Sequence, residues 1–298
     1  MPLFLKCVAP WVRVMVIDES VGQMQLSVIL PASNEAALIG DCLAAILTSD
    51  WDGSGVQVIV VANGCTDDTA HQARTKTQAF SERGWQLQVI ERTQGGKLGA
   101  LNAGDDAARG AVRVYLDADV IISRGLLWQL ANVLESRTAR YASGAVNITS
   151  KGWISGAYAR IWRQVPFMTE CVPGCGVYAV NAEGRTRWAD FPDIISDDTF
   201  VRLCFTPHER IGVSASYDWP IAEGFRNLVK VRRRQDLGVD QIGLEYSDLV
   251  GNDDKPQFPF GRKLGLAMRH PLGFLIYSAV AVVSRLTRSR DTGWSRSR

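Results

Sequence analysis

Short runs of β-branched and other apolar residues alternate with segments of helical periodicity from residue 26 onward. Such runs predict strands at 26–30 (LSVIL), 56–62 (VQVIVVA), 87–90 (LQVI) and 112–116 (VRVYL). After the first run, six apolar residues share one helical face: Leu38, Ile39, Cys42, Leu43, Ile46 and Leu47. Ser33 or Asn34 is the expected N-cap of that helix. The alternation predicts an α/β fold with a mainly parallel sheet flanked by helices on both faces.

The later parts of the chain keep this rhythm less strictly. Further helices are expected through about residue 83, at 98–109, at about 124–136 and from 196, with a strand near 140–147. A chain of 298 residues is long enough for one large domain with an appendage. We expect an N-terminal extension at 1–25, a catalytic domain at 26–238 and a helical extension at 239–298.

Polar residues follow the predicted strands at their carboxyl ends: Asn34, Glu35, Asn63, Asp67, Lys97, Asp117 and Asp119. In open α/β sheets, ligands bind in the crevice outside these strand ends. The residues are therefore expected to converge on one rim of the sheet.

Asp117 and Asp119 interrupt the apolar stretch 111–123 (AVRVYLDADVIIS). Strand alternation would send both side chains to the same side, where two carboxylates repel each other unless a cation neutralises them. Mg²⁺ or Mn²⁺ is the expected partner, because hard divalent ions take oxygen ligands and complete their shells with water and phosphates. The alternative is a pair of acids solvated at the edge of a loop.

Asp197 and Asp198 begin a predicted helix after Ser196, its expected cap. Acids in a first helical turn suit the helix dipole, and this could be their whole role. A metal bound to a substrate diphosphate would offset the negative charge of that diphosphate as it leaves. The reaction would then still need a base for the nucleophile, and Asp198 is the best candidate.

Arg232, Arg233 and Arg234 form a basic run that either clamps the diphosphate or is a solvated face.

Several other mechanisms lack their motifs. The sequence has no G-x-S-x-G elbow, no H-E-x-x-H pair and no G-x-G-x-x-G after the first strand, and TQGGKLG (93–99) lacks P-loop spacing. The six cysteines are scattered, which indicates free thiols in a reducing cytosol rather than disulfides. Cys171 and Cys175 alone are weak evidence for zinc.

The two ends of the chain raise the question of membrane contact. The apolar segment 1–17 is broken by Lys6, Pro10 and Arg13, so a secretory signal is not expected. The apolar run 271–283 is shorter than the roughly 20 residues of a spanning helix, and it either lies in a bilayer interface or packs on the domain. The basic tail 285–298 holds five arginines and one aspartate, which fits either a solvated tail or contact with anionic lipid.

Five motifs in order resemble the family 2 glycosyltransferases over roughly residues 26–238. They are ILPASNE (29–35), VVANGCTDDT (60–69), GGKLGALNAG (95–104), LDADV (116–120) and ISDDTF (195–200). The resemblance implies a GT-A fold and an inverting, nucleotide-sugar-dependent enzyme that uses Mg²⁺ or Mn²⁺.

The resemblance also implies a role for each matching residue. Pro31 and Glu35 would border the nucleoside, Asn63 the base and Lys97 the nucleotide end of the pocket. Asp117 would reach the ribose or the metal, and Asp119 would bind the metal. Asp198, with Asp197 beside it, would deprotonate an acceptor hydroxyl that attacks the anomeric carbon from the face opposite the diphosphate. Beside these residues, Arg233 and Arg234 of the basic run are expected in the nucleotide-sugar site, because guanidinium groups bind phosphate oxygens.

The chain departs from the family pattern in three places. Ala62 and Asn63 replace a frequent pair of aspartates, so uracil is not secured as the base, because an amide both donates and accepts hydrogen bonds. Asp197 stands where the family has glutamate. The Q-x-x-R-W signature of processive members is missing, which disfavours polymer synthesis.

The leading hypothesis is a hexosyltransferase-type enzyme that transfers one sugar, with a UDP-sugar as the favoured donor. Its acceptor would be saccharide or lipid-linked, in cell-envelope or exopolysaccharide synthesis, and nucleic acid is not an expected partner. The expected location is the cytoplasm, including peripheral contact with the inner face of the membrane. Aromatic residues would supply acceptor-facing surface or core: Trp153, Tyr158, Trp162, Phe167, Tyr178 and Trp188. The alternatives are a metal-dependent phosphohydrolase of the D-x-D type and a catalytically silent membrane-associated scaffold.

Overall fold

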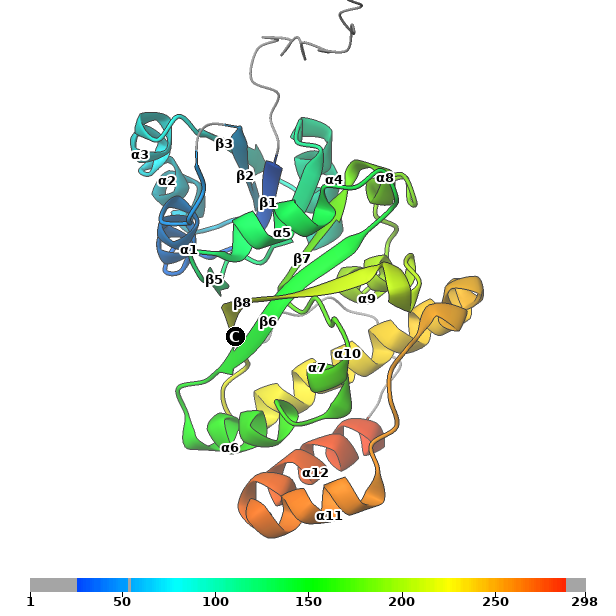
Figure 1. Ribbon diagram of the computed structural model, residues 1–298. Coiled ribbons are helices and arrows are strands. Elements are labelled where there is room, and N and C mark those ends of the chain that lie inside the picture. The colour runs from blue at the N-terminus through cyan, green and yellow to red at the C-terminus, as the bar shows by residue number, and fades with distance from the viewer. Residues whose placement is uncertain (1–25, 53–54, 288–298) are drawn as a thin grey trace, which may run out of the picture.

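The computed structural model describes residues 26–52 and 55–287 (Figure 1). Within these residues the chain forms an eight-stranded sheet with the strand order β3-β2-β1-β4-β7-β6-β8-β5. The strands are β1 (Leu26–Ala32), β2 (Val56–Asn63), β3 (Gln86–Arg92), β4 (Val112–Leu116), β5 (Ile121–Ile122), β6 (Tyr141–Thr149), β7 (Val177–Asn181) and β8 (Arg210–Pro220). The expectations for 1–25 and for the tail beyond 287 lie outside the described residues.

The four strands predicted first form a parallel half-sheet, in the order β3-β2-β1-β4. Their side chains pack into two apolar clusters. One cluster joins Val28 and Leu30 with buried residues of α1 (Ile39–Leu47) and α5 (Leu126–Leu134). The other joins Ile29 and Ile59 with α4 (Lys97–Ala107). Because adjacent residues of one strand enter different clusters, helices cover both faces of this half, as predicted.

The second half makes the sheet mixed. β7 is antiparallel to β4 and to β6, β6 and β8 run parallel, and β5 is antiparallel to β8. The sequence predicts β6 but not β7, which lies in the Gly- and aromatic-rich stretch 150–190. An insertion of β7 between β4 and β6 is a long-range pairing that local periodicity does not encode.

The helical elements differ in detail from the predictions. The expected helix through residue 83 is two short helices, α2 (Thr69–Arg74) and α3 (Thr77–Glu82). The predicted N-caps of α1 are wrong, because α1 begins at Ile39 and neither side chain caps it. The Ser33 hydroxyl instead donates to the Asn63 carbonyl, and Asn34 Oδ1 accepts from the Thr66 amide. These bonds tie the loop after β1 to the loop after β2.

The remaining helical elements follow β5. They are α6 (Trp153–Trp162), α7 (Pro166–Glu170), α8 (Ala182–Arg185), α9 (Asp197–Leu203), η1 (Pro207–Glu209), α10 (Phe225–Glu245), η2 (Ser247–Asn252), α11 (Phe260–Arg269) and α12 (Pro271–Leu286). α10 runs through the boundary expected at 238/239, so no element ends there. A Cβ on Gly238 would lie 2.3 Å from Ser196 Oγ, which shows how closely α10 packs against the start of α9. The apolar run 271–283 belongs to α12, and no helix in the described part of the chain is long and apolar enough to cross a membrane.

Ion pairs fix the segment between α10 and α11 to the rest of the domain. Arg202 bonds Asp253 and Asp254, each at 2.6 Å, and Arg210 bonds Asp254 at 2.6 Å. Both arginine side chains are nearly fully buried, so they need these acids to offset the loss of water.

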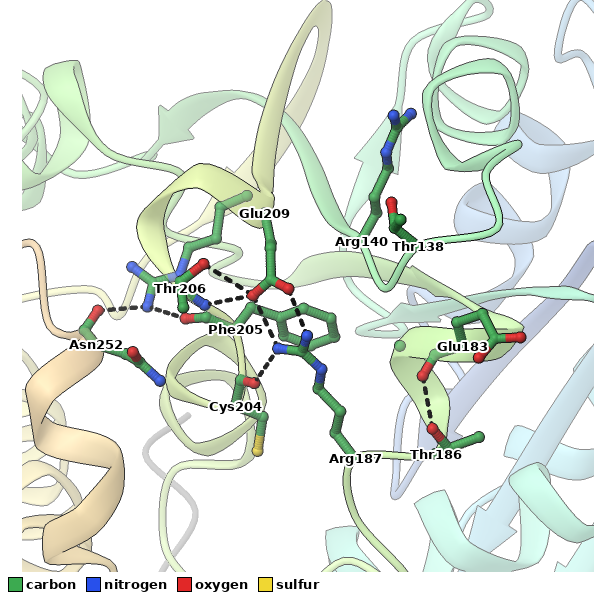
Figure 2. Close-up of polar contacts among 12 residues, drawn as sticks. Thr138, Arg140, Glu183, Thr186, Arg187, Cys204, Phe205, Thr206, Glu209 and Asn252 are labelled. Atoms are coloured by element: carbon green, nitrogen blue, oxygen red, sulfur yellow. Dashed lines mark hydrogen bonds and ion pairs between the residues drawn. The ribbon is translucent and has the colours of Figure 1, made fainter.

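Hydrogen bonds to the Glu209 carboxylate hold the turn before β8, as Figure 2 shows. Glu209 accepts hydrogen bonds from the Thr206 amide and hydroxyl and from both terminal nitrogens of Arg187. The hydrogen bonds from Arg187 and Thr206 outweigh burial and lower the pKa of Glu209 to about 2.

Candidate functional site

A cavity of about 970 Å³ opens at the carboxyl ends of β1, β2 and β4 and is closed on its other side by α6, β8 and α10. Six of the seven expected rim residues line it: Asn34, Glu35, Asn63, Lys97, Asp117 and Asp119. Pro31, Arg232 and Arg234 line it as well. Asp67 is not in this lining, because it accepts hydrogen bonds from the Ala36 amide and from Thr69. The structure thus brings most of the expected rim residues together.

Lys97 is the cation that meets Asp117. Its Nζ lies 2.9 Å from Asp117 Oδ1 and 3.0 Å from Asp197 Oδ1. Burial disfavours the charged ammonium, but Asp117 and Asp197 outweigh burial and raise the pKa of Lys97. Lys97 is therefore a permanent positive charge that links the D-x-D segment to the start of α9.

The position of Lys97 depends on the turn before α4. Gly96 precedes the helix with φ 130°, a backbone conformation that favours glycine. Its amide donates to Asn63 Oδ1 at 3.0 Å. The Asn63 side chain also donates to the carbonyls of Ala32 at 2.9 Å and Val61 at 3.3 Å. Asn63 thus holds β1, β2 and α4 in place, and its amide is engaged with the backbone rather than open for a base.

Asp117 and Asp119 line the same cavity, but not for the reason given by strand alternation. β4 ends at Leu116, and the Val120 amide donates to the Asp117 carbonyl at 3.1 Å, so the pair lies in a turn. In the described part of the chain, no three His, Cys, Asp or Glu residues gather in an arrangement that could hold a metal ion. Protein carboxylates at this site would therefore supply at most part of a metal's ligand shell.

Asp198 lies beside a smaller inner cavity of about 60 Å³, together with Lys97, Asp117, Asp197 and Tyr178. Burial and the neighbouring Asp197 raise the pKa of Asp198 to about 6, although Lys97 opposes the rise. Asp197 is almost fully buried and accepts a hydrogen bond from the Tyr178 hydroxyl at 3.2 Å. Ser196 stands at the N-cap position of α9, as predicted, but its side chain makes no capping hydrogen bond. Both acids border the inner cavity, Asp197 with Tyr178 and Lys97 as its partners, and Asp198 with the Thr199 amide, which donates to its Oδ1 at 2.7 Å.

The basic run on α10 divides between two surfaces. Arg232 and Arg234 line the large cavity with Val231 and Gln235. Arg233 does not line it, and its guanidinium donates to the Thr287 hydroxyl at the end of α12. Consecutive helical residues point about 100° apart, so three arginines in a row do not serve one site. The structure therefore gives no cavity contact for Arg233.

Aromatic residues form much of the opposite wall. Tyr158 and Trp162 of α6 and Trp219 of β8 line the large cavity. The rings of Trp162 and Trp219 pack edge to face, with their centroids 5.2 Å apart. Tyr178 borders only the inner cavity, whereas Trp153, Phe167 and Trp188 line neither. Trp219 and Glu223 also line the large cavity, although neither belongs to a recognisable sequence motif. The alternating strand β8 that brings them there was not predicted.

A family model described as glycosyl transferase family 2 matches residues 27–174, which include β1 to β6 and the D-x-D turn. This chain belongs to glycosyl transferase family 2. The predicted family is thus confirmed, and the D-x-D follows the fourth strand, not the first as a phosphohydrolase of the D-x-D type would require.

The chain is also similar to curated proteins, and each similarity covers only part of the relative. The chain is 37% identical over 95 residues to the glycosyltransferase AglE of Haloferax volcanii, covering 32% of this chain and 30% of that protein. It is 28% identical over 171 residues to a beta-monoglucosyldiacylglycerol synthase of Synechocystis sp., covering 54% and 34% respectively. The chain therefore matches about a third of the length of these relatives.

Solved structures share the fold over more of the chain. The mannosyltransferase PcManGT of Pyrobaculum calidifontis, in complex with GDP-Man and Mn²⁺, has a TM-score of 0.59 at 21% identity, covering 89% of this chain and 76% of that chain. TarS 1–349 of S. aureus, in complex with UDP, has a TM-score of 0.50 at 13% identity, covering 92% and 95%. At these identities the likeness shows the fold, and it confirms the predicted GT-A arrangement.

Proposed function

We propose that this family 2 member transfers one sugar from a nucleoside diphosphate sugar to a hydroxyl acceptor, with inversion at the anomeric carbon. The observation that supports this most is the shared lining of one cavity by the D-x-D acids and Lys97, with Asp198 beside its inner end. Both cavities are bordered by Pro31, Lys97, Asp117 and Trp219. A donor in the large cavity would therefore have a candidate base within the same space.

Asp198 is suited to the role of general base. With a pKa of about 6 it is mostly ionised at pH 7, by about ten to one, yet it binds a proton more readily than an ordinary aspartate. It would accept the proton of the acceptor hydroxyl as the hydroxyl oxygen attacks the anomeric carbon. Lys97, which is paired with Asp197, would limit the rise in the pKa of Asp198 that burial and Asp197 cause.

Asp117 and Asp119 would hold Mg²⁺ or Mn²⁺. Two carboxylates fit such an ion only if phosphate oxygens and water complete its shell, which is the usual arrangement for these metals. Bound with a diphosphate, the ion would supply positive charge that offsets the charge of the leaving group. Arg232 and Arg234 line the same cavity and would contact the phosphates from α10.

A UDP-sugar is the proposed donor. PcManGT is in complex with GDP-Man and TarS 1–349 with UDP-GlcNAc, so the shared fold does not choose the base. Because the Asn63 amide is bonded to the backbone, the base would be recognised by other groups, among them the neighbouring Pro31 and Glu35. The aromatic wall suits a saccharide or lipid-linked acceptor of cell-envelope or exopolysaccharide synthesis. We place the enzyme in the cytoplasm or on the inner face of the membrane.

Calorimetry with UDP and GDP, with and without Mn²⁺, tests the donor site. We expect one nucleotide to bind, and more tightly with the metal. If neither UDP nor GDP binds, with or without Mn²⁺, the proposal is overturned.

Asp198→Asn tests the base. The variant should lower kcat by about 10²-fold to 10⁴-fold, since it removes the proton acceptor, while nucleotide affinity stays within about threefold. Asp190→Asn, which changes an exposed aspartate, is the matched control. A large loss of nucleotide affinity in Asp198→Asn would instead assign Asp198 to the donor pocket.

A further inference from the structure

The two C-terminal helices expose a row of large apolar side chains. On α11, Phe260, Leu264 and Met268 recur every four residues, and on α12 the exposed residues are Leu272, Leu275, Val282 and Leu286. Phe260, Met268 and Leu286 are each more than 70% exposed. At 100° per residue, the exposed residues of each helix fall on one stripe.

The opposite faces of the same helices are packed, so the exposed stripes have a defined orientation. Gly273, Val280 and Ser284 of α12 are buried, and a Cβ on Gly273 would lie 2.8 Å from the Ala157 carbonyl of α6. Leu266 is the buried residue of α11. Figure 1 shows α11 and α12 together at the end of the molecule away from β1, β2 and β3, with α6 and α10 next to them. We name the exposed face of these two helices the C-terminal apolar face.

The charged side chains carried by these two helices have one sign. From Lys255 to Arg290 the sequence holds seven lysines and arginines and no aspartate or glutamate. Of the arginines, Arg262 bonds Glu170 of α7, whereas Arg269 and Arg285 are exposed. Apolar stripes flanked by cations are typical of helices that lie in the interface of an anionic bilayer.

We propose that the C-terminal apolar face docks on an anionic lipid bilayer and so presents the cavity to an acceptor carried by a lipid. The apolar side chains would enter the interface, and Lys263, Arg269 and Arg285 would meet lipid phosphates. No helix of the described residues spans a bilayer, so the attachment is parallel to the surface. The acceptor part of this inference rests on the proposed glycosyl transfer, whereas the docking part does not.

Only one layer of helices separates the C-terminal apolar face from the large cavity. Tyr158 of α6 lines the cavity, and its ring lies 5.1 Å from that of Tyr277 on α12. The Arg232 guanidinium, from the cavity wall on α10, also lies over the Tyr277 ring at 6.0 Å. A hydroxyl close to the headgroup of a bilayer-bound lipid would therefore have a short path to the aromatic wall.

Flotation of the full chain with vesicles tests the docking. We expect binding to phosphatidylcholine vesicles that contain about 30% of the anionic lipid phosphatidylglycerol. We expect little binding to vesicles of phosphatidylcholine alone. Leu275→Asp should lower the partition coefficient at least about tenfold, because it removes one apolar side chain that would enter the bilayer interface and adds a negative charge. Leu244→Asp on α10 is the matched control, since Leu244 is 84% exposed but lies outside the face.

A second pair of variants tests the charge. Arg269→Gln and Arg285→Gln should each lower the partition coefficient about fivefold, and high salt should remove most of this difference. Arg137→Gln, at an exposed arginine elsewhere, should have no effect. Unchanged vesicle binding in Leu275→Asp, or no binding by the unmodified chain at low salt, would overturn the proposal.

Two further measurements separate the possible failures. Light scattering after size exclusion would show a stable dimer that Leu275→Asp dissociates if the face instead binds a second copy, which would reject the lipid partner. Nucleotide affinity of Leu275→Asp should equal that of the unmodified chain. If docking fails while nucleotide still binds, only this inference falls, and if nucleotide fails to bind while docking persists, only the proposed function falls.

Discussion

Lys97→Met removes the one positive charge between two acids of the site. Lys97 Nζ lies 2.9 Å from Asp117 and 3.0 Å from Asp197, and the Asp197 side chain is only 6% exposed. At an effective dielectric constant of about 20, each pair gains roughly 5.5 kcal/mol before desolvation is subtracted. Breaking a buried pair by removing one partner costs about 3–5 kcal/mol.

The expected loss is shifted toward the lower end of that range, because Lys97 and Asp117 remain 27% and 32% exposed and water can screen them. We expect Lys97→Met to lower the free energy of unfolding by about 2–4 kcal/mol at pH 8. Without the ammonium, the carboxylates repel each other and the pKa of Asp198 rises above about 6, since Lys97 lowers it in the intact site. A carboxyl whose pKa is raised in the folded state favours folding as pH falls. The loss should therefore be smaller at pH 5.

Urea unfolding at pH 8 and pH 5 measures both effects. Lys151→Met, at an exposed lysine, is the control and should change the free energy of unfolding by less than about 0.5 kcal/mol. A Lys97→Met variant that is as stable as this control at both pH values would refute the role assigned to Lys97.

Three other features of the structure can each be tested by one measurement. The logarithm of kcat/KM should fall with unit slope below about pH 6, because Asp198 must be ionised to accept a proton, and a limb near pH 4 would contradict its raised pKa. Glu209→Gln should lower stability by about 1–2 kcal/mol at pH 7 in urea unfolding, because it weakens the charge-assisted bonds from Arg187. Since the pKa of Glu209 is lowered to about 2, that contribution is complete above about pH 4.5 and lost as pH falls toward 2, so an equal difference at pH 3 would oppose the assignment. Gly110→Ala places a Cβ 2.5 Å from the Ser27 amide and should cost about 1–3 kcal/mol, whereas Gly40→Ala, with no atom within 4 Å, should stabilise by up to about 1 kcal/mol.

The parallel half of the fold could be read from local patterns. Strands β1 to β4 are apolar runs bounded by turns, and α1 repeats its apolar residues every three to four positions, so each element is encoded within a few residues. The rim could be predicted for the same reason, because the carboxyl ends of parallel strands must meet at one edge. Order along the chain was enough to bring Glu35, Lys97 and Asp117 to that edge.

The rest depended on contacts between distant segments. β7 inserts between β4 and β6. Its pairs with β4 join residues that are 60 to 70 positions apart in the sequence, such as Leu116 with Val177 and Val112 with Asn181. The orientation of Arg233 toward Thr287 depends on how α12 packs against α10. Neither feature has a local signal, because the residues that decide it are far away in sequence.

The sequence by itself determined the family, the parallel half-sheet and the edge at which the acids and Lys97 gather, since short-range periodicity and strand polarity dictate these. Only the tertiary structure decided which partner each side chain has. It directed Lys97 to both Asp117 and Asp197, engaged the Asn63 amide with the backbone and left one face of α11 and α12 exposed. The physical reason is that a side chain's charge state and its availability to a ligand are set by neighbours within a few ångströms, and folding chooses those neighbours from the whole chain.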